Sequence, residues 1–164
     1  YGGIMIDTNN FTNRTGVRTF EAAAYLKKNG ADITKVRRMF RDDISDYKAK
    51  AMAIQNTEIF MDEYAISVCT AGNVSSPTVV GAQAANELLN VKNVKASFVC
   101  TPYLEQIYIS ARSIDKVNVQ IIMEEFGGGG HMNLAGAQVR DKSLGEVIRI
   151  LKQIIERKLE EGDI

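Results

Sequence analysis

The chain has 164 residues, of which 45% are apolar and 24% charged, a composition typical of a soluble globular protein. Its 20 basic and 20 acidic residues cancel, so no overall positive field attracts long duplex nucleic acid, whose binding depends on phosphate neutralisation. No run of 18 apolar residues occurs, and the N-terminus lacks the pattern of a signal peptide. This composition does not exclude the binding of a small anionic ligand at a local site.

The first 56 residues predict the end of a strand, a polar loop and then helices. The apolar run 3–6 is interpreted as the strand end, and Asp7 follows it at the start of the loop. Helices are expected over about 20–28, 33–40 and 44–56. Because these elements show no alternation of strand and helix and the chain does not begin with Met, we expect the tail of a larger domain, with a boundary near Asn56.

From Thr57 onward the pattern alternates between strands and helices. Strands are predicted over about 58–61, 64–69, 95–100, 107–113 and 137–140, and helices over about 77–90, 118–126 and 144–155. This predicts an α/β fold, a mixed sheet with flanking helices, for residues 57–164. Cys69 and Cys100 lie in strand-like apolar runs, where buried free thiols are expected.

The strongest local signal is the run of four glycines that precedes His131. One glycine after Phe126 would be enough to end a helix, whereas glycines within regular elements cost roughly 0.5–1 kcal/mol each relative to alanine. The run therefore predicts that a ligand approaches the backbone and that successive amides bind an anion. A flexible glycine turn is the alternative, and Glu124 and Glu125 would oppose an anion unless they point away.

Three further positions carry side chains suited to phosphate or metal. His131 is the only histidine, and its imidazole N–H would donate to phosphate. Ser110 and Arg112 share one face of a predicted strand, and arginine presents a planar fork of donors. Asp7 is placed for a metal or a phosphate. The alternatives are a surface histidine, an exposed edge-strand arginine and an Asx-turn.

Taken together, these segments resemble a known family. Gly127–His131 with Asn133–Gly136, and 109–113 upstream, are similar to the DHHA1 domain of the DHH phosphoesterase superfamily. Residues 3–8 and 11–23 resemble the end of the preceding DHH domain, particularly that of the membrane-anchored cyclic di-AMP phosphodiesterases of Gram-positive bacteria. The resemblance divides the chain into a short, mainly helical DHH remnant with its connecting helix over 1–56 and a DHHA1-like domain over 57–164.

The resemblance implies metal-assisted hydrolysis of a nucleotide phosphodiester. It makes Asp7 a ligand of paired Mn²⁺ ions in the parent protein. It assigns Gly128, Gly129, Gly130 and His131 to substrate phosphate, with Ser110 and Arg112 nearby. The Asp-His-His signature is absent from this chain, so we expect it to lack tight manganese binding and hydrolysis.

The partners implied are cyclic di-AMP or a short oligoribonucleotide, and the missing DHH domain of the same parent. A homodimer stays open. The resemblance also implies a cytoplasmic position without membrane contact for this segment, in a parent anchored in the bacterial plasma membrane. Two alternatives remain: an oligoribonucleotide (nanoRNA) phosphatase or single-strand exonuclease of the same superfamily, and a non-catalytic RNA-binding module.

Overall fold

The structure is a computed structural model that describes residues 1–164 except 13, 71, 73, 75 and 115. It divides into two compact units, Tyr1–Asp43 and Ile44–Ile164. Each unit is described by itself. The predicted helix over 44–56 falls in the second unit as α4 (Ile44–Gln55), whereas the family boundary near Asn56 stays a prediction.

The first unit contains three helices, α1 (Gly2–Asp7), α2 (Val17–Lys28) and α3 (Ile33–Met39). The last two confirm the predicted helices, and the Asp32 carboxylate caps α3 by accepting from the Lys35 amide at 3.1 Å. The strand expected over 3–6 is wrong. Four apolar residues cannot distinguish a strand from a helix by periodicity, and here the Thr8 hydroxyl donates to the Ile4 carbonyl at 2.6 Å, as helical spacing allows.

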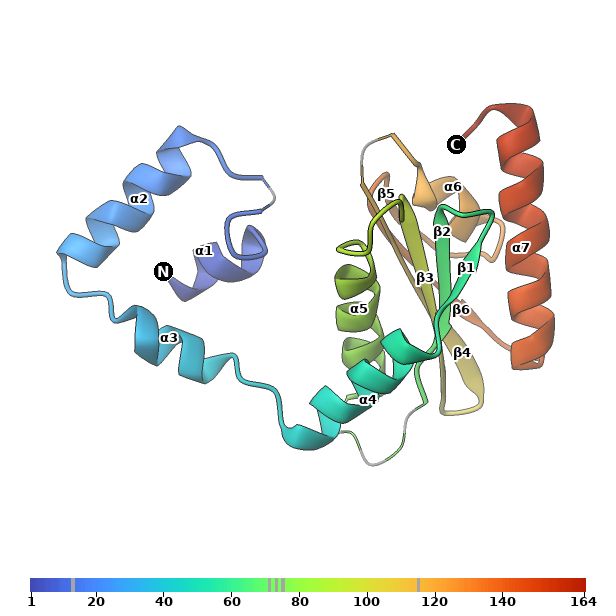
Figure 1. Ribbon diagram of the computed structural model, residues 1–164, viewed down its shortest axis with the longest axis horizontal. Coiled ribbons are helices and arrows are strands. Elements are labelled where there is room, and N and C mark those ends of the chain that lie inside the picture. The colour runs from blue at the N-terminus through green and yellow to red at the C-terminus, as the bar shows by residue number, and fades with distance from the viewer. Residues whose placement is uncertain (13, 71, 73, 75, 115) are drawn as a thin grey trace. The chain divides into compact units, whose positions relative to one another are not determined.

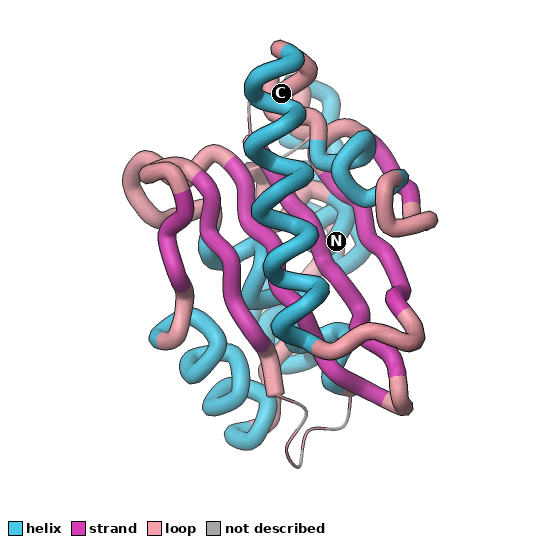
Figure 2. Tube along the Cα trace, turned by 90° about the vertical axis from the view of Figure 1, so that its right-hand side faces the viewer, coloured by secondary structure: helices cyan, strands magenta, loops and turns pink. Residues whose placement is uncertain are grey.

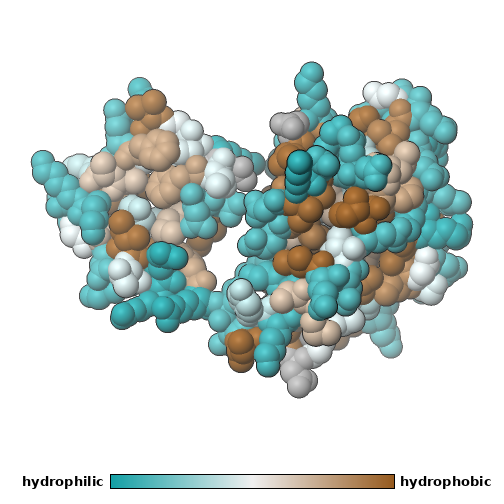
Figure 3. Space-filling view, in the orientation of Figure 1, coloured by the Kyte–Doolittle hydropathy of each residue, from teal (hydrophilic) through white to brown (hydrophobic). Residues whose placement is uncertain are grey.

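The first unit has almost no core of its own. Among its described residues only Thr8 and Ala23 are buried, while large apolar side chains lie exposed. Figure 3 shows several apolar residues on the surface of this part of the chain. The exposed ones are Ile6, Val17, Phe20, Tyr25, Met39 and Phe40. An exposed apolar set of this kind is typical of a segment that normally packs against more protein.

The second unit is built on a six-stranded sheet in the order β1-β2-β3-β4-β6-β5 (Figure 1). Its strands are β1 (Glu58–Phe60), β2 (Tyr64–Val68), β3 (Ala96–Tyr103), β4 (Gln106–Ser113), β5 (Gly129–His131) and β6 (Leu134–Val139). Both predicted hairpins, β1–β2 and β3–β4, are confirmed. The pair β2–β3 is parallel and the other pairs are antiparallel, so the mixed sheet is confirmed.

The parallel pair requires a crossover, and α5 (Pro77–Leu88) supplies it. Val80, Ala84 and Leu88 of α5 pack on Ala65 of β2 and Val99 of β3, and α4 adds Ala53 to the same cluster. Two buried hydroxyls tie these helices to the sheet: Ser97 donates to the Ala85 carbonyl at 2.7 Å, and Ser67 donates to the Ala53 carbonyl at 2.5 Å. One face of the β2–β3 region is thereby covered.

The opposite face of the sheet is covered by α6 (Val119–Glu124) and α7 (Leu144–Glu161), and Figure 2 shows α7 lying across it. The core on this side contains Phe98, Ile109, Ile122, Leu151 and Ile155, all essentially inaccessible to water. The predicted capping box of α7 is confirmed. The Ser143 hydroxyl accepts from the Glu146 amide at 3.3 Å, and the Glu146 carboxylate accepts from the Ser143 amide at 2.7 Å.

The two cysteines are buried free thiols, as predicted, and they lie on opposite faces of the sheet. Cys69 packs in the cluster under α5, and Cys100 packs in the core under α7. Burial raises the pKa of the Cys100 thiol to about 12. Among the described residues, no helix combines the length and the apolar character needed to cross a bilayer.

The close contact between α5 and β3 yields a stability prediction. A Cβ at Gly81 would collide with the buried Thr101 hydroxyl, so Gly81→Ala should lower the free energy of unfolding by about 1–3 kcal/mol. Gly145→Ala is the matched control, because a Cβ there meets open space in the first turn of α7. Urea denaturation should find the control unchanged or slightly more stable. Equal stability of both variants would contradict the contact.

Candidate functional site

Strand β4 has one buried row of side chains and one open row. Ile107, Ile109 and Ala111 are buried, whereas the alternating residues from Gln106 to Arg112 are only partly covered. The open row lies on the face that carries α5, because Arg112 contacts Asn86 of that helix. Strand β6 continues the pattern, since Ala135, Ala137 and Val139 are buried while the residues between them are accessible. The β4–β6 part of this face is therefore the open surface of the sheet.

The strand register arranges the open surface in rows. Arg112 lies opposite Leu134, which lies opposite His131. Ser110 lies opposite Gly136, which lies opposite Gly129, and Tyr108 lies opposite Gln138. The middle row therefore has a single hydroxyl followed by two glycines without side chains. We call this row, Ser110–Gly136–Gly129, the glycine floor.

The glycine run is not the open amide loop that the sequence predicted. The amide of Gly127 donates to the Glu124 carbonyl, and that of Gly128 donates to the Met123 carbonyl, each at 2.9 Å. These two bonds close the C-terminus of α6, and Gly127 has the left-handed φ of +72° that such an end requires. Strand β5 then begins at Gly129. A helix carbonyl thus accepts from the Gly128 amide, while the assignment of Gly128 to substrate phosphate stays a prediction.

Packing explains two of the remaining glycines and leaves one without a structural reason. A Cβ at Gly128 would lie 2.6 Å from the Ala137 Cβ, and one at Gly130 would lie 2.6 Å from the Ala135 Cα. Gly130 also has φ +147°, a conformation that other residues rarely adopt. Gly129 has neither restriction, since a Cβ there would enter open space. A ligand on the glycine floor would supply the missing reason.

Hydrogen bonds to Ser113 of β4 and Val119 of α6 fix the turn between β5 and β6. The Ser113 amide donates to the Asn133 carbonyl at 3.1 Å, and the Asn133 side-chain amide donates to the Ser113 hydroxyl at 3.1 Å. The Val119 amide donates to the Met132 carbonyl at 2.9 Å. Asn133 therefore fixes the hairpin that carries His131, which accounts for its place beside the glycine run.

Arg112 is a partly buried cation without an acidic partner among the described residues. Its Nε donates to Asn86 Oδ1 at 3.0 Å, and Nη1 donates to the carbonyls of Ala111 and Ala135 at 2.9 and 3.5 Å. Burial lowers the pKa of its guanidinium from the ordinary value. All three partners are neutral, so they orient the guanidinium and leave its charge uncompensated. An anion on the open surface would compensate it.

His131 is exposed and lies in the same row as Arg112, on the far side of Leu134. Two strand spacings separate their backbones, about 9.5 Å. Both side chains are long enough to approach one ligand from opposite sides. The structure thus brings Ser110, Arg112, Gly129 and His131 to one surface of the sheet. The assignment of these residues, and of Gly128 and Gly130, to substrate phosphate stays a prediction.

An open hollow of about 490 Å³ lies over Ser110 and Gly136 of the glycine floor. It is lined also by the predicted Gly128, and by Tyr108, Gln138, Arg140 and Thr78, which were not predicted. Gly129, Arg112 and His131 lie outside its lining. Period-two alternation from Ser110 back to Tyr108 could have identified one of the missed residues. Gln138 and Thr78 depend on pairings that the sequence does not specify.

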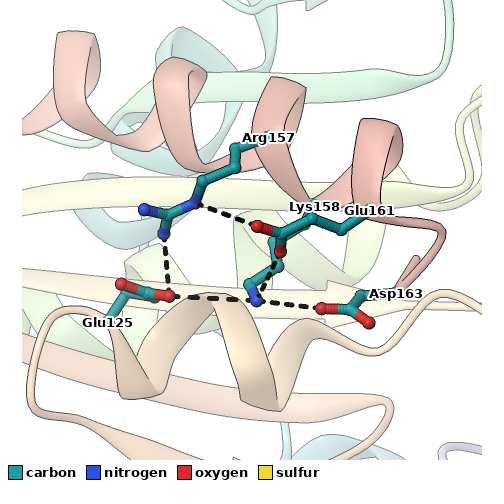
Figure 4. A network of polar contacts seen from close by, with 5 residues as sticks. All are labelled: Glu125, Arg157, Lys158, Glu161 and Asp163. Carbon is teal, nitrogen blue, oxygen red and sulfur yellow. Dashed lines mark hydrogen bonds and ion pairs between the residues drawn. The ribbon is translucent and has the colours of Figure 1, made fainter.

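The acidic residues that precede the glycine run are directed into other contacts. Glu125 pairs with Arg157 at 2.8 Å and lies 4.0 Å from Lys158, while Glu124 accepts from the Gln120 side chain at 2.8 Å. Lys158 also binds Glu161 and Asp163, each at 2.9 Å, and Figure 4 shows this network between α6 and the end of α7. The network compensates the charge of Glu125 and fixes the end of α6, where the glycine run starts.

The residues described here do not make up a manganese site. Asp7 is exposed at the C-terminal end of α1, and not at the end of a strand. Within the described part of the chain, no three His, Cys, Asp or Glu side chains are grouped as metal ligands. One exposed carboxylate cannot hold two metal ions. The role of Asp7 as one ligand among several stays a prediction.

Comparison with known proteins identifies the family. Residues 62–157 match the DHHA1 domain. The chain belongs to the DHHA1 family. It is 41% identical to the cyclic-di-AMP phosphodiesterase PdeA of Listeria monocytogenes over 94% of its length, and 41% identical to the cyclic-di-AMP phosphodiesterase GdpP of Bacillus subtilis over 98%. It spans about a quarter of the length of these relatives, 23% and 25% respectively.

The fold of this DHHA1 chain also has a close counterpart among solved structures. An exopolyphosphatase-related protein from Bacteroides fragilis superposes with a TM-score of 0.84 and 23% identity, covering 94% of this chain and 48% of the other. At this identity the likeness concerns the fold alone. It supports the mixed sheet with flanking helices.

The contrast among the glycines gives a prediction about stability. Gly128→Ala and Gly130→Ala should each lower the melting temperature by several degrees, because the new Cβ meets backbone or Cβ atoms of β6. Gly129→Ala should have the same melting temperature as the wild type. Differential scanning calorimetry of the three variants measures this. A loss of stability in Gly129→Ala equal to the other two would show that folding, and not a ligand, requires that glycine.

Proposed function

We propose that this chain is the nucleotide-binding part of a phosphodiesterase that hydrolyses cyclic di-AMP to linear pApA. The family and the names of two relatives, each 41% identical, support the proposal. The observation that carries it is Arg112, a partly buried guanidinium with no acidic partner among the described residues, beside a floor of glycine. A neutral ligand would leave that charge uncompensated.

The residues on the open surface are suited to a phosphate group. The guanidinium of Arg112 supplies charge and direction, since its Nε and Nη1 are held by Asn86 and two carbonyls while its Nη2 has no hydrogen bond to a described residue. Ser110 adds a hydroxyl at the edge of the glycine floor, and His131 adds an imidazole from the far strand. Several donors converging on one oxyanion make a stronger site than any one alone.

Hydrolysis belongs to residues beyond those described. The relatives are about four times longer than this chain. We therefore assign the manganese ions, and the DHH domain that would hold them, to the rest of a larger protein, which the resemblance further implies to be anchored in the membrane. This chain would bind the dinucleotide without cleaving it.

Titration and turnover assays test the proposal together. By isothermal titration calorimetry the chain should bind cyclic di-AMP or linear pApA, and it should release no pApA from cyclic di-AMP when Mn²⁺ is added. Binding of tRNA without binding of either dinucleotide would favour the RNA-binding module. Turnover with Mn²⁺ would refute the assignment of catalysis to other residues.

Arg112→Ala should weaken dinucleotide binding by about tenfold or more, because a charge-assisted hydrogen bond contributes about 1.5–3 kcal/mol. Arg149→Ala is the matched control. Arg149 is exposed on α7, where it donates to Gln153. Cys100→Ala should bind more tightly than Arg112→Ala, since its thiol is buried on the opposite face. Identical affinity of Arg112→Ala and Arg149→Ala would show that the strand face is wrongly assigned.

A further inference from the structure

The hollow contains a second group of side chains next to the glycine floor. Tyr108 lies opposite Gln138 on neighbouring strands, and both belong to the open face of the sheet. Arg140 lies two residues beyond Gln138, and its Nε donates to Gln106 Oε1 at 3.3 Å. These residues are not explained by the phosphate contacts proposed above.

The group has the chemistry of a planar heterocycle site. The Tyr108 ring is partly exposed and is steadied by Tyr103, whose ring centroid lies 6.3 Å away at an angle of 50°. Gln138 is exposed, and its side-chain amide makes no hydrogen bond to another described residue. Its amide offers a donor and an acceptor side by side. A ring for stacking beside such an amide fits a nucleobase better than an aliphatic or purely anionic ligand.

The spacing links this group to the glycine floor. Tyr108 and Gln138 lie one row away from Ser110 and Gly136, and two residues along a strand span about 6.6 Å. A base and its own phosphate in one nucleotide are separated by a comparable distance. The hollow of about 490 Å³ has the size of a small-molecule site.

We propose that Tyr108 and Gln138 form an adenine-binding subsite, in which Tyr108 stacks on the base and Gln138 pairs with its edge. This inference rests on the proposed function, since the phosphate on the glycine floor brings the base to the hollow. Adenine presents one donor and one acceptor side by side, which matches a carboxamide. At the edge that carries N7, where adenine offers this pair, guanine presents two acceptors, and Gln138 can satisfy only one of them with a donor.

Arg140 also lines the hollow. Its side chain is exposed, and its Nε donates to Gln106. Arg140 therefore contributes positive charge beside the group formed by Tyr108 and Gln138.

The test measures affinity for linear pApA and linear pGpG by calorimetry. Wild type should prefer pApA, and Gln138→Leu should bind pApA at least fivefold more weakly while its affinity for pGpG falls by a smaller factor. Gln153→Leu is the matched control, because Gln153 is exposed on α7. Tyr108→Leu should weaken both dinucleotides, whereas Tyr108→Phe should bind both like wild type.

The outcomes separate this inference from the proposed function. If pApA binds wild type and Gln138→Leu equally, or if pGpG binds wild type as tightly as pApA, the subsite is overturned while dinucleotide binding stands. If Tyr108→Leu binds like wild type, the stacking role is overturned. If wild type binds no dinucleotide, the proposed function has failed, and the subsite fails with it.

Discussion

The asymmetric covering of strand β4 determines where this protein can bind a ligand. Its buried row of side chains lies under α6 and α7, so that face is sealed by core packing. On the other face α5 packs on β2 and β3, and the β4–β6 surface remains open beside it. A crossover helix is required by the parallel pair β2–β3 and cannot cover the entire sheet. The open surface follows from the topology.

The glycine run meets two demands within four residues. Gly127 ends α6, while Gly128 and Gly130 allow the chain to lie directly against β6. These are requirements of folding, and they bring the chain to a position where Gly129 can leave the floor bare. A motif that looks uniform in the sequence is therefore divided between the fold and the site. Arg112 shows the same division, since the fold orients its guanidinium and leaves its charge uncompensated.

The sequence predicted the parts that depend on local patterns. Alternation placed Ser110 and Arg112 on one face of a strand, and cap residues located α3 and α7. The sequence-based prediction failed where the structure does not depend on a local pattern. The run 3–6 was too short to show a period, and Gly129–His131 forms a strand only because β6 lies beside it. Gln138 joins Tyr108 through a pairing between segments 30 residues apart in the chain, which no local pattern specifies.

The margins of the sheet have a consequence for how the protein behaves in concentrated solution. The outermost strands, β1 and β5, have three residues each. Another chain can add a strand to an exposed sheet edge, and a longer edge strand offers it more unpaired backbone N–H and C=O groups. Edge strands of three residues offer an incoming strand few such groups. The proposed binding surface can thus stay open while the sheet edges offer little support for the strand-to-strand association that leads to fibres.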